Sequence, residues 1–279
     1  MYPIDYLERA KDLDRLTGPA QRLARKLPPG RIRDALHGVW LGHPLHPLLV
    51  QVPVGTWLSA SLLDAWPRNE TASRRLVLAG MAASVPAALA GATDWSEQHE
   101  QQMRVGVVHA LANTAALALY AVSLANPGRA KVLRLAGLTA VAAGGLLGGH
   151  IAYRQSAGAN HAEAVPHLVE PGWHDLMAPA EARELADQKP VKRMLGDVPV
   201  VVVRDGNDVH VLAEQCCHLS GPLSDGDYVD GCLTCPWHGS TFRVADGTVA
   251  RGPATAPQPV FDTRVTADGA LQVCLPGAG

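Results

Sequence analysis

The stretch CCHLSGPLSDGDYVDGCLTCPWHGSTF, residues 216–242, holds four cysteines and two histidines. Cys216 and His218 form a C-x-H pair, and Cys235 and His238 form a C-x-x-H pair. Zinc sites with this donor set usually group the cysteines before the histidines, whereas each short segment here offers one thiolate and one imidazole. This order favours a two-iron cluster, with both cysteines on one iron and both histidines on the other, and a zinc site is the alternative.

Strand-like segments surround these two pairs. The apolar runs are short and alternate with polar residues, and Gly-containing turns (RDGN, ADGT, ADGA) separate them, which is typical of antiparallel strands. The runs are VPVVVVRDG (198–206), VHVLAEQ (209–215), TFRVADGTV (241–249) and LQVCLP (271–276). We therefore expect a small all-β domain over residues 173–279.

The bulk composition is consistent with a metal centre. All five cysteines follow residue 215, and an odd, clustered set is a poor disulfide framework but a good source of metal ligands. The net charge of -2 provides no strongly basic face, so we expect no nucleic-acid partner.

The C-x-H and CPWHGSTF motifs resemble those of the Rieske [2Fe-2S] family, over about residues 173–275. The resemblance implies that Cys216, His218, Cys235 and His238 hold the cluster. It also implies that the proline-bearing run GPATAPQP, from Gly252, covers the cluster. The residues expected around the cluster are Ser240, Trp237, Gly239 and Pro253. Cys217, Cys232 and Cys274 are then spare.

Two positions indicate which Rieske type is closest. Gly221 and Trp237 stand where the cytochrome bc type carries an extra disulfide, so the chain looks more like the ferredoxins that feed ring-hydroxylating dioxygenases. Phe242 stands where the high-potential type has a tyrosine hydroxyl, whereas Ser240 can donate a hydrogen bond to the cluster. We therefore expect a reduction potential in the lower half of the Rieske range of roughly -150 to +300 mV.

The first half of the chain contains four apolar spans, each near the length of about 20 residues that crosses a bilayer as a helix. They are Leu48–Trp66, Leu76–Thr93, Val105–Ala125 and Leu135–Tyr153. We predict a membrane α-helical four-span bundle over residues 47–153, between a basic N-terminal arm (1–46) and a linker (154–172). A soluble helical bundle is the alternative.

The segments GHPLHPLLVQVPVG, GATDW, HALAN and GGHIAYRQ resemble the four-span bacterial membrane proteins of the DUF2231 family, over about residues 36–158. The resemblance implies topology and little chemistry. Eight Lys and Arg residues precede the first span, so the positive-inside bias favours cytoplasmic placement of the N-terminus and the Rieske domain. With no recognisable export signal at the N-terminus, we expect a multi-pass protein of a bacterial inner membrane.

Polar residues in or near the predicted spans gather at one face of the membrane. They are His46, Asp94, His109, Asn113 and His150. Ionisable groups at membrane depth are candidates for function. Three interpretations remain open: a haem b held by His109 and His150, a quinone pocket, or a polar cluster that joins helix ends.

The sequence continues for about 40 residues after His238, so we expect no mononuclear iron domain of a catalytic oxygenase subunit. Three hypotheses follow. The protein is a membrane-anchored carrier of single electrons to or from a redox partner protein, or a two-centre membrane redox protein with haem or quinone in its helical half, or a redox sensor that controls a membrane protein.

Overall fold

The structure is a computed structural model, and it describes residues 4–277. The described residues form two units, one made of residues 4–37 and 44–157 and the other of residues 38–43 and 158–277. The first is helical and the second is built on β-sheets.

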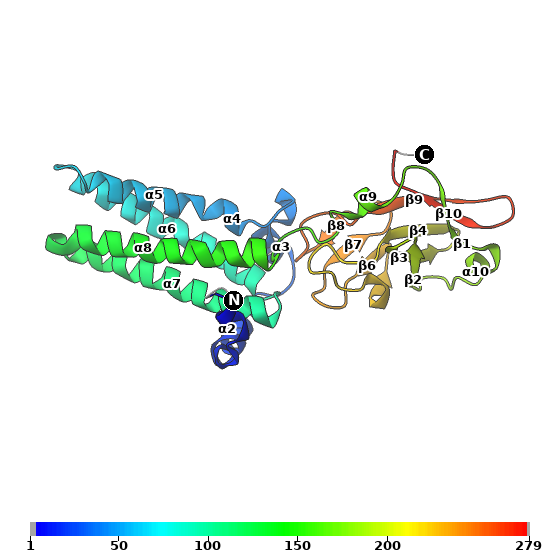
Figure 1. The fold of residues 1–279 in the computed structure, drawn as a ribbon, viewed down its shortest axis with the longest axis horizontal. Helices are drawn as coiled ribbons and strands as arrows, with labels where there is room; N and C mark the ends of the chain where they lie inside the picture. The colour runs from blue at the N-terminus through cyan, green and yellow to red at the C-terminus, as the bar shows by residue number, and fades with distance from the viewer. Residues whose placement is uncertain (1–3, 278–279) are drawn as a thin grey trace. The chain divides into compact units, whose positions relative to one another are not determined.

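The helices α5, α6, α7 and α8 lie side by side in the helical unit (Figure 1). Its elements are α1 (Asp5–Arg9), η1 (Lys11–Leu13), α2 (Asp14–Ala24), α3 (Arg31–His37), α4 (His46–Leu49), α5 (Gln51–Leu63), α6 (Glu70–Trp95), α7 (Glu100–Ala125), η3 (Pro127–Arg129), α8 (Ala130–Gly149) and the π-helical η4 (His150–Arg154). The short η2 (Val39–Leu41) belongs to the other unit. α5 packs mainly on α6, and α7 mainly on α8, so the bundle consists of two helical hairpins in lighter mutual contact.

Three helices are long and apolar enough to cross a membrane, namely Glu70–Trp95, Glu100–Ala125 and Pro127–Arg154. They contain the second, third and fourth predicted spans. The first predicted span is divided between α4 and α5, and α5 has only 13 residues. Pro53 lacks the N–H that would bond to the carbonyl of Leu49, which accounts for the break near Val50, and Pro67 follows the end of the helix.

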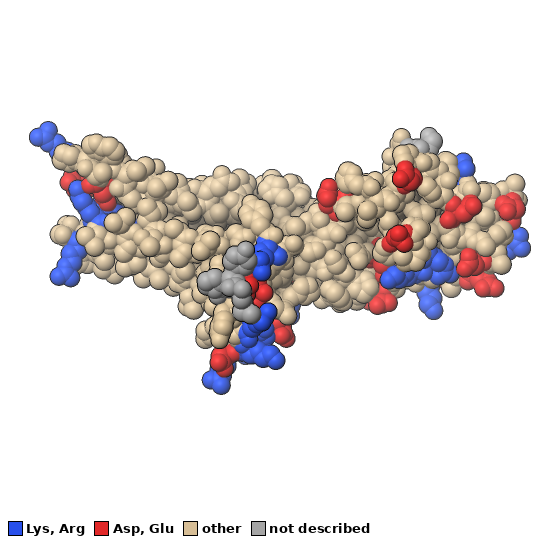
Figure 2. All heavy atoms as spheres, in the orientation of Figure 1, with Lys and Arg blue, Asp and Glu red and all other residues tan. Residues whose placement is uncertain are grey.

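The surface of the helical unit is apolar between its ends. Large side chains such as Leu58, Val85, Leu111 and Leu146 are exposed there. Figure 2 shows that, on the face in view, the Lys, Arg, Asp and Glu side chains of the described residues in this unit gather at its ends. An exposed apolar band of this kind suits contact with lipid.

Aromatic rings pack closely inside the bundle. The rings of Trp57 and Tyr120 stack with centroids 4.5 Å apart, and both side chains are buried. Gly80 makes the packing of Trp57 feasible, because a Cβ at that position would lie 2.3 Å from the indole nitrogen. At one end, the buried Arg134 and Asp64 form an ion pair of 2.8 Å.

The basic N-terminal arm is helical and is fixed to the bundle. Arg104 of α7 binds Asp14 of α2 through Nε (2.7 Å) and Nη2 (2.8 Å). Arg33 of α3 is buried and donates to Glu97 and to Ser96 Oγ, between α6 and α7. The charges of the arm therefore bind specific partners in the bundle.

The second unit contains two antiparallel sheets (Figure 1). One sheet has six strands in the order β1-β10-β9-β4-β3-β2, and the other has four in the order β5-β6-β7-β8. The strands are β1 (His174–Met177), β2 (Val191–Leu195), β3 (Val198–Asp205), β4 (Asp208–Ala213), β5 (Asp227–Val229), β6 (Cys232–Thr234), β7 (Thr241–Arg243), β8 (Val249–Arg251), β9 (Val260–Val265) and β10 (Leu271–Cys274). The short helices are α9 (Val165–Leu168), α10 (Pro179–Arg183) and η5 (Leu223–Asp225).

The valine run of β3 is buried on both faces of its sheet. Val201 and Val203 belong to one core, which also contains Cys216 and Cys235. Val200 and Val202 belong to a second core on the opposite face. The six-stranded sheet thus provides a rigid support for the cysteine-bearing loops.

Most of the segment predicted as a linker, residues 154–172, is part of the β unit. Residues from 158 onward pack with the β unit, where Ala162 is fully buried in the cysteine-bearing core and Val169 is buried in the second core. The His161 N–H donates to the carbonyl of Cys217 (2.9 Å). Apolar side chains within the polar segment account for this packing.

Candidate metal centre

The two predicted ligand loops have the same backbone geometry. In the β4–β5 loop, the Cys216 N–H donates to the Gly221 carbonyl (2.9 Å), and the Ser220 N–H donates to the Cys216 carbonyl (2.8 Å). In the β6–β7 loop, the Cys235 N–H donates to the Ser240 carbonyl (2.8 Å), and the Gly239 N–H donates to the Cys235 carbonyl (3.0 Å). Ser220 and Gly239 both have positive φ, of 60° and 76°. Each loop thus folds back on its own cysteine.

The loops bring the four predicted ligand side chains together. The thiols of Cys216 and Cys235 are buried and lie within hydrogen-bonding reach of each other. The rings of His218 and His238 have centroids 5.1 Å apart and lie edge to face. Both histidines are partly exposed, whereas both cysteines are buried. Two sulfurs inside and two imidazoles outside form the donor set that a two-iron cluster needs.

The environment of the two thiols favours their protonated form. The neighbouring Cys217 thiol raises the pKa of Cys216 to about 12. The Cys216 thiol and burial raise the pKa of Cys235. Because metals bind the thiolate, a metal bound here would displace these protons. Gly221 leaves room beside the sulfur, since a Cβ there would lie 2.8 Å from Cys235 Sγ and 3.1 Å from the Trp237 ring.

The proline-bearing segment from Gly252 packs against the second loop. The Ala254 N–H donates to Ser240 Oγ (3.0 Å), and Ser240 is fully buried. Ser240 accepts this bond with its oxygen, so its hydroxyl hydrogen remains available for another acceptor. Pro253 is buried, and Trp237 is 51% exposed beside His238.

Two supporting residues were missed by the sequence analysis. The buried Gln258 accepts from the Cys217 N–H (3.0 Å) and donates to the carbonyls of Ala213 (2.8 Å) and Gln215 (2.7 Å). The buried Glu214 accepts from Ser224 Oγ (2.6 Å) and Ser224 N–H (3.1 Å), and burial raises its pKa. A polar residue at the end of the apolar run VHVLA was the available signal for Glu214, and Gln258 had no such signal.

The cysteines expected to be spare have other surroundings. The Cys217 thiol donates to the Ala256 carbonyl (3.1 Å), and the Cys274 thiol donates to the Leu275 carbonyl (3.2 Å). Cys232 lies in β6, opposite Arg243 of β7. The Cys217 thiol also lies within hydrogen-bonding reach of the Cys216 thiol.

The structure divides the predicted polar site of the helical unit into three groups. His46 and His109 lie together, with ring centroids 6.2 Å apart. Asn113 contacts His109, because its amide nitrogen lies 3.2 Å from His109 Nε2 and donates to the His109 carbonyl (2.9 Å). Asp94 contacts instead His37 of α3, which is buried and lies 2.7 Å away through Nδ1.

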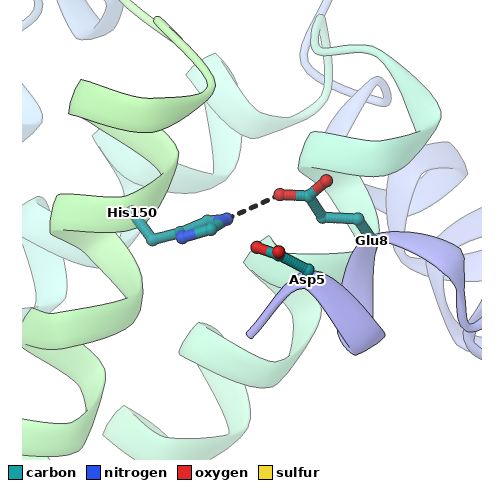
Figure 3. Close-up of side chains that lie close together, drawn as sticks. All are labelled: Asp5, Glu8 and His150. Atoms are coloured by element: carbon teal, nitrogen blue, oxygen red, sulfur yellow. Dashed lines mark hydrogen bonds and ion pairs between the residues drawn. The ribbon is translucent and has the colours of Figure 1, made fainter. Parts of the chain in front are cut away.

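His150 belongs to the third group. Its Nε2 lies 2.7 Å from Glu8 Oε1, and Asp5 completes a set of three ligand-type atoms within 4.8 Å of one another (Figure 3). Arg154 forms an ion pair with Asp5 (3.3 Å), so the group joins α1 to the end of the last long helix. Glu8, Asp5 and His37 all lie in the N-terminal arm, of which the sequence analysis named only His46 as a candidate.

His109 and His150 were expected at about the same depth. α7 begins at Glu100, five residues before the predicted span, so His109 lies deeper in its helix. Its Nδ1 lies 2.7 Å from the Gly144 carbonyl, more than one helical turn before His150. The imidazole rings that lie next to each other are therefore those of His46 and His109. The pair predicted from the sequence as haem ligands was His109 and His150.

The comparisons with known proteins cover both units. Residues 175–262 match the Rieske [2Fe-2S] domain family, and residues 42–161 match DUF2231, a family of predicted membrane proteins. The anthranilate 1,2-dioxygenase ferredoxin subunit of Burkholderia cepacia is 32% identical over 101 residues, which are 36% of this chain and 90% of that protein. Ferredoxin CarAc of Metapseudomonas resinovorans is 34% identical over 71 residues, 25% of this chain and 66% of that protein.

Among solved structures, the ferredoxin of carbazole 1,9a-dioxygenase from Nocardioides aromaticivorans IC177 is 24% identical, with a TM-score of 0.34, over 38% of this chain and 99% of that one. The match to nearly a whole ferredoxin subunit, the motif and the paired loops agree on one family and one cofactor, a Rieske-type [2Fe-2S] cluster. Through its β unit, the chain belongs to the Rieske [2Fe-2S] family.

Proposed function

We propose that this protein is a membrane-anchored Rieske carrier that passes single electrons to or from a redox partner protein. Cys216 and Cys235 would hold one iron and His218 and His238 the other. The observation that carries the proposal is the pair of matching loops, which place two buried thiols behind two partly exposed imidazoles. Electrons would enter and leave on the imidazole side, where Trp237 offers an exposed apolar surface for contact.

The proposed anchor is the helical unit. Three helices have the length and composition of membrane spans. α4 and α5 together cover His46–Leu63, about 27 Å of helix at 1.5 Å per residue. Val52, Leu58 and Leu62 of α5 are exposed, as in the longer helices. We propose that this divided segment is also a span, the first of four along the chain. Four spans would put both tails on one side, the cytoplasmic face of a bacterial inner membrane.

The ligand assignment is tested on the full chain purified in mild detergent. Cys216→Ser and Cys235→Ser should each abolish the visible bands and the electron paramagnetic resonance signal of the dithionite-reduced cluster. Cys217→Ser is the matched control, since Cys217 is equally buried beside a ligand but bonds to the Ala256 carbonyl. Loss of the cluster in Cys217→Ser with retention in Cys216→Ser would refute the assignment.

Anchoring and sidedness need a separate measurement. Bacterial membranes should retain the protein after a carbonate wash, and protease added to right-side-out vesicles should leave the β unit intact. Protease added to inverted vesicles should release a fragment that carries the cluster signal. If protease releases the cluster-bearing fragment from right-side-out vesicles, the orientation is the opposite of the proposed one. If carbonate extracts the protein from the membrane, the proposal of a membrane anchor is wrong.

A further inference from the structure

The two neighbouring histidines of the helical unit are held in the same way. His46 Nδ1 lies 2.8 Å from the Ala87 carbonyl of α6, and His109 Nδ1 lies 2.7 Å from the Gly144 carbonyl of α8. A carbonyl only accepts hydrogen bonds, so Nδ1 carries the hydrogen in both rings. The neutral imidazoles then carry their lone pairs on Nε2, which is the usual arrangement of metal-ligating histidines with a carbonyl behind them.

Glycines allow both rings to lie close to a neighbouring helix. A Cβ at Gly91 would lie 2.7 Å from His46 Nδ1 and 2.8 Å from its Cε1. A Cβ at Gly148 would lie 3.3 Å from His109 Cε1. Each ring thus packs by its Nδ1–Cε1 edge on the partner helix of its own hairpin, His46 on α6 and His109 on α8.

The spacing of the rings identifies the kind of metal geometry that they suit. An imidazole nitrogen about 2 Å from a metal puts the ring centroid about 3.1 Å from it, so two opposite rings have centroids about 6 Å apart and two at a tetrahedral angle about 5 Å. The His218–His238 distance of 5.1 Å fits the tetrahedral case. The His46–His109 distance of 6.2 Å fits two ligands on opposite sides of one metal.

The surroundings favour haem over a bare ion. A bare ion would need further protein ligands, and the carboxylate of Asp94, which interacts electrostatically with His46, is already hydrogen-bonded to His37. A porphyrin supplies four ligands and neutralises ferrous iron, which suits apolar surroundings. His46 and His109 come from different hairpins, and these hairpins are in light contact, so a planar group between the rings would lie along the boundary between them.

We propose that His46 and His109 are the axial ligands of a haem b in the helical unit. The site goes beyond the proposed function and does not depend on it, because the cluster can carry electrons without a haem. Asn113 would release His109 Nε2 on haem binding and keep its bond to the His109 carbonyl.

The test uses the full chain, produced with added 5-aminolevulinate and purified in mild detergent. The wild type should show a sharp Soret band and split bands after reduction, and a pyridine haemochromogen assay should identify haem b. His46→Leu and His109→Leu should each lower the haem content at least tenfold. His150→Gln is the matched control, because this histidine of the same unit binds Glu8 instead and should keep full haem content.

Two further measurements separate ligand loss from misfolding and from poor loading. Hemin titrated into the purified protein should give a saturable Soret shift in the wild type and in His150→Gln but not in His46→Leu. Added imidazole should restore hemin binding to His109→Gly. The cluster signal of the β unit should be unchanged in all these variants, which would show that a loss of haem in His46→Leu and His109→Leu is not a loss of the folded chain.

The proposal is overturned if the wild type neither contains haem nor binds hemin, or if haem depends on His150 and survives His46→Leu. Iron, copper or zinc found without haem, and lost in both His46→Leu and His109→Leu, would also overturn it and would identify a mononuclear ion site.

Discussion

The two histidine pairs of this chain are positioned by different parts of the backbone. His218 and His238 lie on short loops between strands, and each loop is closed by hydrogen bonds to its own cysteine. His46 and His109 lie on helices, and each ring is held by a carbonyl of a neighbouring helix and by a glycine below it. The first geometry is local in sequence, whereas the second depends on how the helices pack.

The two sites should differ in how well they tolerate substitutions of the surrounding residues. The loops are supported by a β core in which Leu212, Leu233 and Phe242 are fully buried. The helix pair depends on small residues, so an added methyl group is enough to displace a ring. We therefore expect the cluster to be lost when one of its ligand residues is replaced. The helical site should be lost when a histidine ligand is replaced, and also when a glycine beside one of the rings is replaced by a larger residue.

The largest expected effect tests whether the two pairs are independent. His238→Ala should abolish the reduced cluster signal, because one iron loses a ligand. Spectra of the helical unit should not change. His210→Ala is the control, since His210 lies in β4, paired with Val203, away from both loops. Electron paramagnetic resonance on equal protein amounts measures the outcome, and a cluster signal that survives His238→Ala would remove this histidine from the ligand set.

The sequence predicted the β centre well because its information is local. The C-x-H and C-x-x-H spacings place ligands on two loops, and alternating runs such as 198–206 indicate the strand that supports them, observed as β3 at Val198–Asp205. Gln258 could not be recognised in advance. It lies in a proline-bearing segment and reaches the first loop only through the tertiary fold.

The helical half was predicted less completely, for reasons of register. Hydropathy found the long helices, but it could not show that α7 starts at Glu100 or that α4 and α5 are separate. An error of five residues at one helix start is more than a turn, and it placed His109 at the depth of His150, whereas His109 lies beside His46. The polar partners Glu8 and His37 come from an arm whose docking the sequence does not reveal.

A smaller effect is expected from replacing Gly91, against which the His46 ring packs, with alanine. In Gly91→Ala the new methyl would lie 2.7 Å from the ring nitrogen, so the ring or the helix must move. We expect a severalfold loss of hemin affinity and a destabilisation of about 1–3 kcal/mol. Hemin titration and thermal unfolding followed by size-exclusion chromatography measure the two quantities.

Gly145→Ala is the matched control for this helix substitution. A Cβ at Gly145 meets no atom within 4 Å, and alanine is the better helix former. This variant should bind hemin as the wild type does and be equally or slightly more stable. Equal behaviour of Gly91→Ala and Gly145→Ala would show that close packing below His46 does not position the ring.

The smallest effect concerns the potential of the cluster. Phe242 is fully buried in the core that contains both cluster cysteines, and its ring offers no hydrogen-bond donor. In Phe242→Tyr a hydroxyl that donates to a cluster sulfur would favour the reduced form. A bond of about 1 kcal/mol corresponds to a rise of roughly 40 mV in the midpoint of a one-electron couple.

Ser240→Ala should shift the midpoint in the opposite direction by a similar amount, because it removes a buried hydroxyl whose hydrogen is available for a sulfur acceptor. A redox titration monitored by electron paramagnetic resonance gives both values, with the wild type expected in the lower half of the range from roughly -150 to +300 mV. A wild-type midpoint above about +200 mV would contradict the assignment to the low-potential type. Shifts of the same sign in Phe242→Tyr and Ser240→Ala would show that core packing, and not hydrogen bonding to sulfur, sets the potential.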